Sequence, residues 1–337
     1  MRLLVAAALV TFAVGTAGCG GGGKHATSTT APPRSQGTAN AAIQQGLRRA
    51  ANPLAAQFPA PNGRTLRALG NSAIGQANFG LSTSVITPGS NRLAFGLIGS
   101  DNHFLYGPTA VYVAPSPDAP AQGPYVAPID SMITAPRFES KTVANDPLAI
   151  KGIYASTVRV SKPGVWTALA LTKTPRGMVG SVVQFAVRRK DAIPAVGQTP
   201  PRIHTPTVAS VHGNLSAIDT RLPHDDMHRV DFAGVIGRRP VVLLFATPQL
   251  CQSRVCGPVT DIELQMEHEF AGKAVFIHNE VYAQNSVNKG LRPQLLAFRL
   301  RTEPWLFTFD RRGRIAARVE GAFGLNAFRA AVRAALR

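Results

Sequence analysis

An apolar run leads directly into a pair of cysteines in the stretch Pro240-Val-Val-Leu-Leu-Phe-Ala246-Thr-Pro-Gln-Leu-Cys251-Gln-Ser-Arg-Val-Cys256. The run from Pro240 to Ala246 has the length of a strand and contains no polar residue, which is typical of a central parallel strand covered on both faces. The cysteines follow at the end of this strand, five positions apart. This stretch decides the fold of the C-terminal third of the chain.

Alternating helix and strand patterns continue from the cysteines to the end of the chain. Apolar residues recur at helical spacing from Val259 to Phe270 and predict an amphipathic helix that ends near Gly272. The pattern then predicts a strand at 274–278, a helix at 294–300, a hairpin of strands at 305–310 and 315–320, and a terminal helix at 325–336. The predicted order is strand, helix, strand, helix, strand, strand, helix, which is an α/β fold.

The spacing of the two cysteines bears on whether they can bond. In a helix, residues five positions apart point about 140° apart with Cα atoms about 8 Å distant, whereas a disulfide requires Cα atoms within about 7 Å. Pro258 disfavours a helix through the cysteines because it lacks an N–H and clashes with the carbonyl group four residues back. We therefore expect the helix to begin at Pro258, after Gly257, and Cys251 and Cys256 to lie in a loop that can close. Arg254 and the nearby helix N-terminus would stabilise a thiolate.

This order of elements, with three local features, resembles the thioredoxin superfamily over residues 239–337. Cys251 and Cys256 occupy the loop where that family keeps its redox site. Glu303-Pro304 stands immediately before the hairpin, where the family carries a cis-proline that faces this site, and Gly321 follows the last strand, as a glycine does in thioredoxins. The resemblance implies a thioredoxin-like domain with these site residues: Cys251, Cys256 and Pro304 as catalytic residues, and Thr247, Arg254 and Glu303 in support.

Two branches of the superfamily differ in their cysteine motif. Thioredoxins and their exported relatives carry Trp-Cys-x-x-Cys, whereas Q-type peroxiredoxins carry Thr-Pro-x-Cys-x4-Cys. This chain has the peroxiredoxin spacing, although Thr247-Pro248 lies one residue further from Cys251, and Val196-Gly-Gln198 is similar to a peroxiredoxin entry segment. No arginine flanks Pro304, where peroxiredoxins place one.

Three functions follow from these residues. The first is a thiol–disulfide oxidoreductase in which Cys251 attacks a partner's disulfide and Cys256 resolves the mixed disulfide. The second is a peroxiredoxin-like thiol peroxidase. The third is a non-catalytic binding module with a structural disulfide, of which a minor variant carries copper on Cys251, Cys256 and His278. We predict the first function, with exported protein thiols or disulfides as partners and with no resident cofactor or metal.

Short β-rich runs separated by turn residues dominate residues 76–190. The predicted strands lie at 92–98, 109–113, 154–160, 165–171 and 181–187. Lys162-Pro163-Gly164 predicts a tight hairpin between the third and fourth of these strands. Several short strands with such punctuation favour an antiparallel sandwich. The arrangement resembles an immunoglobulin-like module of exported bacterial proteins, an architectural likeness that brings no site with it.

The N-terminus has the order of a signal peptide: Arg2, an apolar run from Leu3 to Val10, and small residues up to Cys19. It resembles a bacterial lipoprotein signal at 1–19, which implies that Cys19 is lipidated. Residues 20–75 are predicted to form a flexible tether that contains a helical patch near 41–56. The predicted location is the extracytoplasmic face of the cell membrane, where a disulfide can persist.

A linker rich in proline and histidine is predicted at 191–238. Its segment His224-Asp-Asp-Met-His228 offers two imidazoles and a thioether to a soft metal such as copper, or is a polar loop; we predict no metal site. The chain carries a formal net charge of +18, but its arginines are scattered and aromatic residues make up only 7%. We therefore predict no nucleic-acid partner.

Overall fold

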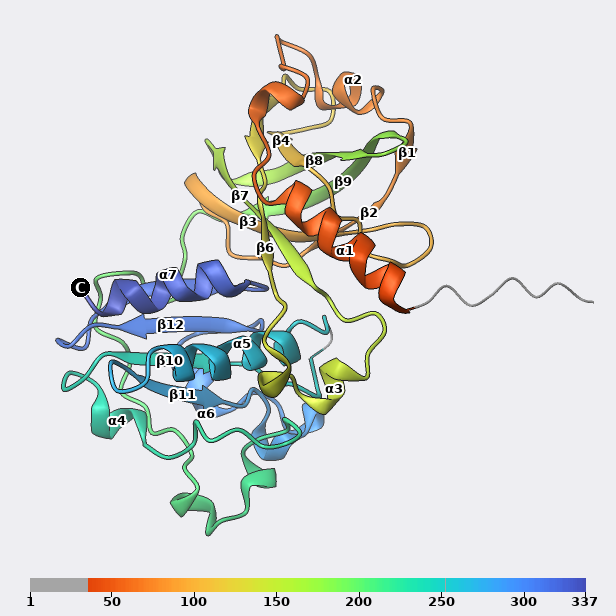
Figure 1. Ribbon diagram of the computed structural model, residues 1–337. Coiled ribbons are helices and arrows are strands. Elements are labelled where there is room, and N and C mark those ends of the chain that lie inside the picture. Colours follow the sequence, from red (N-terminus) through yellow and green to blue (C-terminus); the bar gives the residue numbers. More distant parts are fainter. Residues whose placement is uncertain (1–35, 252) are drawn as a thin grey trace, which may run out of the picture.

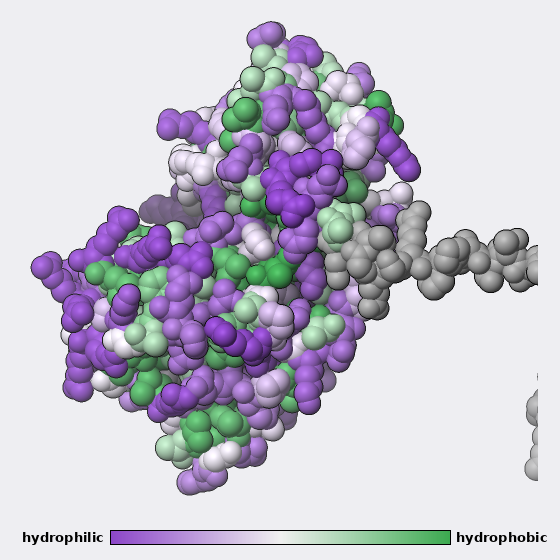
Figure 2. Space-filling model, in the orientation of Figure 1, coloured by the Kyte–Doolittle hydropathy of each residue, from purple (hydrophilic) through white to green (hydrophobic). Residues whose placement is uncertain are grey.

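The computed structural model describes residues 36–251 and 253–337, which form two domains and the segment that joins them (Figure 1). The predicted signal peptide, Cys19 and the first part of the predicted tether, residues 20–35, lie outside the described residues. Within the described residues, no helix combines the length and the apolar character that crossing a bilayer requires. The face drawn in Figure 2 is mainly hydrophilic, with apolar residues in small scattered groups.

The C-terminal domain is built on a four-stranded sheet of order β11–β10–β12–β13. β10 pairs in parallel with β11 and antiparallel with β12, and β12 pairs antiparallel with β13. The elements in chain order are α4 (Phe232–Val235), β10 (Val241–Phe245), α5 (Cys256–Glu269), β11 (Val275–Asn279), η5 (Ala283–Asn285), η6 (Val287–Lys289), α6 (Pro293–Ala297), β12 (Trp305–Phe309), β13 (Ile315–Glu320) and α7 (Leu325–Ala335). The order predicted from the sequence is found.

Alternation along β10 explains why this strand is central. Val242 and Leu244 face a core that α5 and α7 cover, whereas Val241, Leu243 and Phe245 face a second core with residues of α4 and α6. All five side chains are fully buried. A strand buried on both faces reads in sequence as a continuous apolar run, so the run at 240–246 is the direct consequence of helices on both sides of the sheet.

The N-terminal domain consists of two sheets that share one apolar core. Their strand orders are β1–β9–β8–β4–β5 and β2–β3–β7–β6. The strands are β1 (Gly75–Gln76), β2 (Asn78–Leu81), β3 (Gly89–Ile98), β4 (Thr109–Ala114), β5 (Gln122–Val126), β6 (Ile129–Ser131), β7 (Gly152–Val160), β8 (Gly164–Thr174) and β9 (Gly177–Val187). Phe95 and Val158 of one sheet pack with Val111 and Trp166 of the other.

The hairpin predicted at Lys162-Pro163-Gly164 is wrong. β7 pairs with β3 and β6, whereas β8 pairs with β4 and β9, so this turn carries the chain from one sheet to the other. The hairpin lies one turn later, between β8 and β9, where Thr174 is opposite Gly177. Turn residues indicate a reversal of the chain but not whether the second strand pairs with the first or crosses the core.

The flexible tether predicted through residue 75 is wrong for residues 36–75, although the helical patch expected near 41–56 is found in part. They form α1 (Gln36–Ala50), η1 (Ala55–Gln57) and α2 (Leu66–Gly70) and lead into β1. Leu47 and Ala50 bury one face of α1 in the core between the sheets, and Leu66 and Leu69 bury α2 in a smaller core with Tyr112. The apolar face of α1 therefore gains enough burial to hold the segment on the domain.

The linker predicted at 191–238 also packs against the protein. Ile193, Ile203 and Phe232 are buried in the core on the α4 side of the sheet, and Asp219 and Arg221 are buried as well. Its short helical turns are η3 (Ala209–Val211), η4 (Leu215–Ala217) and α4. Isolated apolar residues among prolines and polar residues have no helix or strand period, which is why the sequence pattern concealed their burial.

Polar contacts join the two domains. The Glu320 carboxylate accepts hydrogen bonds from the Ser84 N–H and hydroxyl and from the Val85 N–H. Asp130 accepts from the N–H groups of Asn326 and Ala327, so a side chain of the N-terminal domain caps helix α7. The turns η2 (Pro136–Phe138) and α3 (Lys141–Ala144) reach down to α5.

Candidate functional site

The two cysteines lie at the carboxyl end of β10 and at the start of α5. Cys251 is half-buried in the loop after the strand, and Cys256 is fully buried as the first residue of the helix. The helix thus begins two residues earlier than expected. Pro258 is accommodated because the N–H groups of the first turn have no partner within the helix.

Cys251 is the thiol with the more stable thiolate. A hydrogen bond from the Cys256 thiol, assisted by the Ser253 hydroxyl at 3.3 Å, outweighs burial and lowers the pKa of Cys251 to about 6. Half-exposure and a low pKa are the two properties that make a cysteine nucleophilic near neutral pH.

Cys256 keeps its proton. Burial raises the pKa of Cys256 well above its usual value, and its hydrogen bond to Cys251 and the charge of Cys251 raise it further. The backbone of Thr247, a residue predicted to support the site, acts in the opposite direction. The pair therefore holds one proton, on the inner sulfur, and one negative charge, on the outer sulfur.

Glu303 and Pro304 complete this side of the site. The Glu303–Pro304 peptide bond is cis, as the resemblance implied. Burial, followed by the charge of Cys251, raises the pKa of Glu303 to about 7. Tyr282 was not predicted from the sequence; burial and then the charges of Glu303 and both cysteines raise its pKa.

Comparisons with known proteins find a likeness among solved structures. No protein-family model matches the chain, and no curated protein matches it. Among solved structures the chain is similar to a thiol:disulfide interchange protein, a thioredoxin family protein from Chlorobium tepidum TLS. The match has 16% sequence identity and a TM-score of 0.29, and it covers 44% of this chain and 100% of that chain.

The C-terminal domain has a thioredoxin-like fold. The order and pairing of its elements are those of this fold. β10, α5 and β11 form a parallel strand–helix–strand unit, and β12 and β13 follow as an antiparallel pair in the same sheet, with α7 after them. The cysteines stand between the first strand and the first helix, and Pro304 precedes β12.

Arg254 is not among the main causes of the lowered pKa of Cys251. Its guanidinium lies 3.8 Å from the Asp146 carboxylate of the N-terminal domain and is largely exposed. The left-handed backbone at Arg254, with φ of 58°, turns the loop just before the thioredoxin-like helix α5. The lowered pKa of Cys251 has its largest cause in Cys256, a neutral hydrogen-bond donor.

Cys251 lines an open cleft of about 620 Å³ between the two domains. Pro248, Gln249 and Pro258 form the wall on the thioredoxin-like side, and residues 141–149 form the opposite wall. Gly257 keeps the walls close, since a Cβ there would lie 3.0 Å from the Val143 side chain. No local pattern in the sequence indicated that residues 141–149 reach the cysteine loop.

The copper ligands considered from the sequence do not form one set. Met227 packs in the apolar core on the α5 face of the sheet, whereas His228 faces a buried group of carboxylates. His278 hydrogen-bonds with Asp225 and with the carbonyl group of Ala246. Both ring nitrogens of His278 are thus engaged away from the cysteines.

Proposed function

We propose that the chain is a thiol–disulfide oxidoreductase in which Cys251 is the nucleophile and Cys256 is the resolving thiol. The observation that carries the proposal is the unequal division of protons between two hydrogen-bonded thiols, with the low pKa on the half-exposed Cys251 and the high pKa on the buried Cys256. A staple of two buried sulfurs would need no such difference.

The reaction proceeds in two exchange steps. The Cys251 thiolate attacks one sulfur of a partner's disulfide, a new S–S bond forms, and the other partner sulfur leaves as a thiolate. Cys256 then loses its proton and attacks the Cys251 sulfur. The Cys251–Cys256 disulfide forms, the second partner sulfur leaves, and the partner has gained two electrons and, with two protons, becomes a dithiol.

Glu303 is suited to accept the proton of Cys256. Its charge interacts with both cysteines, and its pKa of about 7 lets it exchange protons with water and with a thiol near neutral pH. Once Cys251 is bonded to a partner, its negative charge is gone. The pKa of Glu303 then falls, so Glu303 loses its own proton. The resulting carboxylate can accept the proton of Cys256.

The substrate class that we propose is exported protein disulfides or thiols. The cleft at Cys251 is open and bounded by both domains, so an extended segment of a partner protein can reach the thiolate. On this proposal the two-sheet domain is an immunoglobulin-like module that helps to select the partner through residues 141–149.

The test is capture of mixed disulfides. In the Cys256→Ser chain, Cys251 should remain bonded to partner proteins, whereas Cys251→Ser should capture none, and the double variant is the matched control for adventitious disulfides. Absence of capture, with an internal disulfide that resists dithiothreitol, would favour a structural staple. Peroxide consumption that depends on Cys251, without capture, would favour the peroxiredoxin-like alternative.

We further propose that Cys19 carries a lipid anchor that holds the protein at the extracytoplasmic face of the cell membrane. The support is the order of charge, apolar run and small residues before Cys19. Mass spectrometry of the mature protein should find a diacylated or triacylated cysteine at the N-terminus. An unmodified N-terminus at another residue would remove this part of the proposal.

A further inference from the structure

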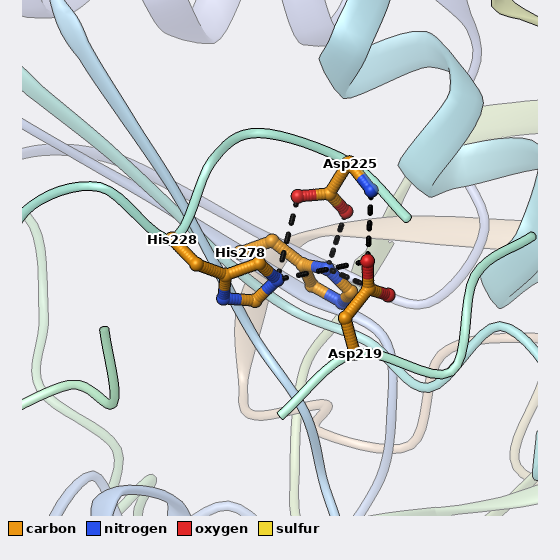
Figure 3. A group of neighbouring side chains, drawn as sticks. All are labelled: Asp219, Asp225, His228 and His278. Carbon is orange, nitrogen blue, oxygen red and sulfur yellow. Dashed lines mark hydrogen bonds and ion pairs between the residues drawn. The ribbon is translucent and has the colours of Figure 1, made fainter. Parts of the chain in front are cut away.

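A second group of reactive side chains lies behind the cysteine loop and is not used by the redox mechanism. Figure 3 shows Asp219 and Asp225 of the segment before β10 converging with His228 and His278, the last from β11. One ligand atom from each of the four residues lies within 4.8 Å of the others. The four side chains are at most 3% exposed.

The distances between the donor atoms place the four donors around one point. The Nδ1 atom of His278 lies 2.8 Å from Asp225 Oδ2 and 4.0 Å from Asp219 Oδ1. The Nε2 atom of His228 lies 3.3 Å from Asp225 Oδ1 and 4.0 Å from Asp219 Oδ2. Tetrahedral zinc, with ligand bonds of about 2.0–2.2 Å, requires its donor atoms to be about 3.3–3.5 Å apart. Small side-chain movements therefore suffice to close the site.

His228 supplies an independent sign that something is missing from the cluster. Its Nε2 atom is buried, is directed at both carboxylates and makes no hydrogen bond to any described residue. Glu263 of α5 is also fully buried, and neither of its carboxylate oxygens has a hydrogen-bond partner in the described part of the chain. Burying unsatisfied polar atoms beside several carboxylates is costly unless a cation compensates them.

The ligands are already oriented in the manner of metal sites. The Nε2 atom of His278 lies 3.1 Å from the carbonyl oxygen of Ala246, which leaves Nδ1 as the atom that faces the carboxylates. A metal-binding histidine usually donates its other N–H to such a backbone oxygen. Backbone N–H groups of Arg221, Asp225 and Met227 hold the two aspartates in place.

We propose that Asp219, Asp225, His228 and His278 bind one divalent transition-metal ion, zinc, in a closed structural site. Two carboxylates and two neutral imidazoles balance the charge of a divalent ion, and nitrogen and oxygen donors in a four-ligand, buried arrangement suit zinc. Because all four positions are protein ligands, the site leaves no open position for substrate, which is the character of a structural rather than a catalytic zinc site.

The location of the ion gives it a structural consequence. It would join the segment at 219–228 to strand β11 directly behind the cysteine loop. Thr220, next to one ligand, accepts a hydrogen bond from the Gln249 N–H and donates one to Glu280. The metal would thus brace the base of the loop that carries Cys251, whether or not the cysteines are catalytic.

The experiment counts zinc on the full chain in which Cys251→Ser and Cys256→Ser remove the thiolates that would bind zinc themselves. After chelation and dialysis against zinc, we expect one zinc per chain by elemental analysis. Cobalt in place of zinc should give the strong visible bands of a tetrahedral site. Absence of stoichiometric zinc, or a weak octahedral cobalt spectrum, would overturn the proposal.

Two variants in the same background locate the ion. His228→Gln should weaken zinc binding by at least about 100-fold, more than the loss usually seen for outer partners of a metal ligand. His204→Gln is the matched control, because His204 pairs with Asp231 at the surface, away from the cluster. This variant should bind zinc as tightly as its parent chain. If His228→Gln retains native affinity, the site is refuted. Should circular dichroism show that this variant is unfolded, Asp219→Asn decides by the same criterion.

Discussion

Removal of the Cys256 thiol should make Cys251 react more slowly at low pH and faster at high pH. The Cys256 thiol is the largest cause of the low pKa of Cys251, about 6. A hydrogen bond to a charged group contributes about 1.5–3 kcal/mol, and 1.36 kcal/mol corresponds to a change of 1 in pKa. In Cys256→Ala the pKa of Cys251 should therefore rise to about 7–8.

The magnitude at each pH follows from two opposing effects. At pH 6 the thiolate fraction falls from about one half to about 1–9%, while the intrinsic reactivity of the more basic thiolate rises about 3–8-fold, so the net rate falls about 2–6-fold. At pH 9 Cys251 is almost fully ionised in both the native chain and the variant, and the variant should react about 3–8-fold faster. The sign is that of an acid with a lowered pKa: the native thiolate persists above about pH 6 and is lost below it.

The assay is the pH dependence of alkylation by iodoacetamide, with each cysteine followed by mass spectrometry of its peptide. Cys256→Ser is the matched control, because its hydroxyl retains a hydrogen-bond donor, and its profile should stay close to that of the native chain. If Cys256→Ala and the native chain share one midpoint, or if the native midpoint lies near that of a free thiol, the hydrogen bond between the sulfurs does not set the reactivity.

The remaining predictions concern stability and the second acid of the site. Gly321→Ala should destabilise the chain far more than Gly272→Ala. Both glycines have φ near 75°, but only the added Cβ at 321 would meet an atom, the Ser82 carbonyl oxygen at 1.8 Å. Urea unfolding compares the two variants, and equal losses of stability would refute the steric argument. Arg221→Met breaks a fully buried ion pair with a carboxylate of α5 at 2.9 Å and should cost about 3–5 kcal/mol in the same assay; a loss below about 1 kcal/mol would contradict that reading. The pKa of Glu303 is about 7 beside the thiolate, so its titration should add a step near pH 7 to the alkylation profile of Cys251. Glu303→Gln should remove that step and leave a single titration, and a profile that keeps both steps would exclude Glu303 as the coupled group.

The thioredoxin-like domain could be predicted element by element because its signals are local. The apolar run at 240–246 reports burial on both faces of β10, and the periodic residues of α5 and α7 report one buried face each. The cysteine spacing and Pro304 are likewise visible within a few positions. Even so, the start of α5 was placed two residues late, because a proline is tolerated at the third position of a helix as well as at the first.

The contacts that complete the sites could not be predicted because they join distant segments. Asp146 reaches Arg254 across the domain boundary, and Asp130 caps a helix almost two hundred positions away. The zinc candidate joins 219–228 to His278 of β11. The sequence contained one weak signal: Asp225 and His228 lie three positions apart, and the predicted strand at 274–278 ends in His278. Only the fold shows that these three residues converge.

On the proposed function, the unequal thiols also explain how one pair can serve both exchange steps. Before reaction, burial and the neighbouring thiolate keep the proton on Cys256, which stabilises the attacking form of Cys251. When Cys251 becomes bonded to a partner sulfur, its charge and its demand for a hydrogen bond disappear together. Two of the three largest causes of the high pKa of Cys256 are then removed, and burial remains together with the smaller effect of the Glu303 charge. We infer that Cys256 becomes a nucleophile only after Cys251 has reacted, so that the order of the steps is set by the electrostatics of the pair and requires no movement of the domains.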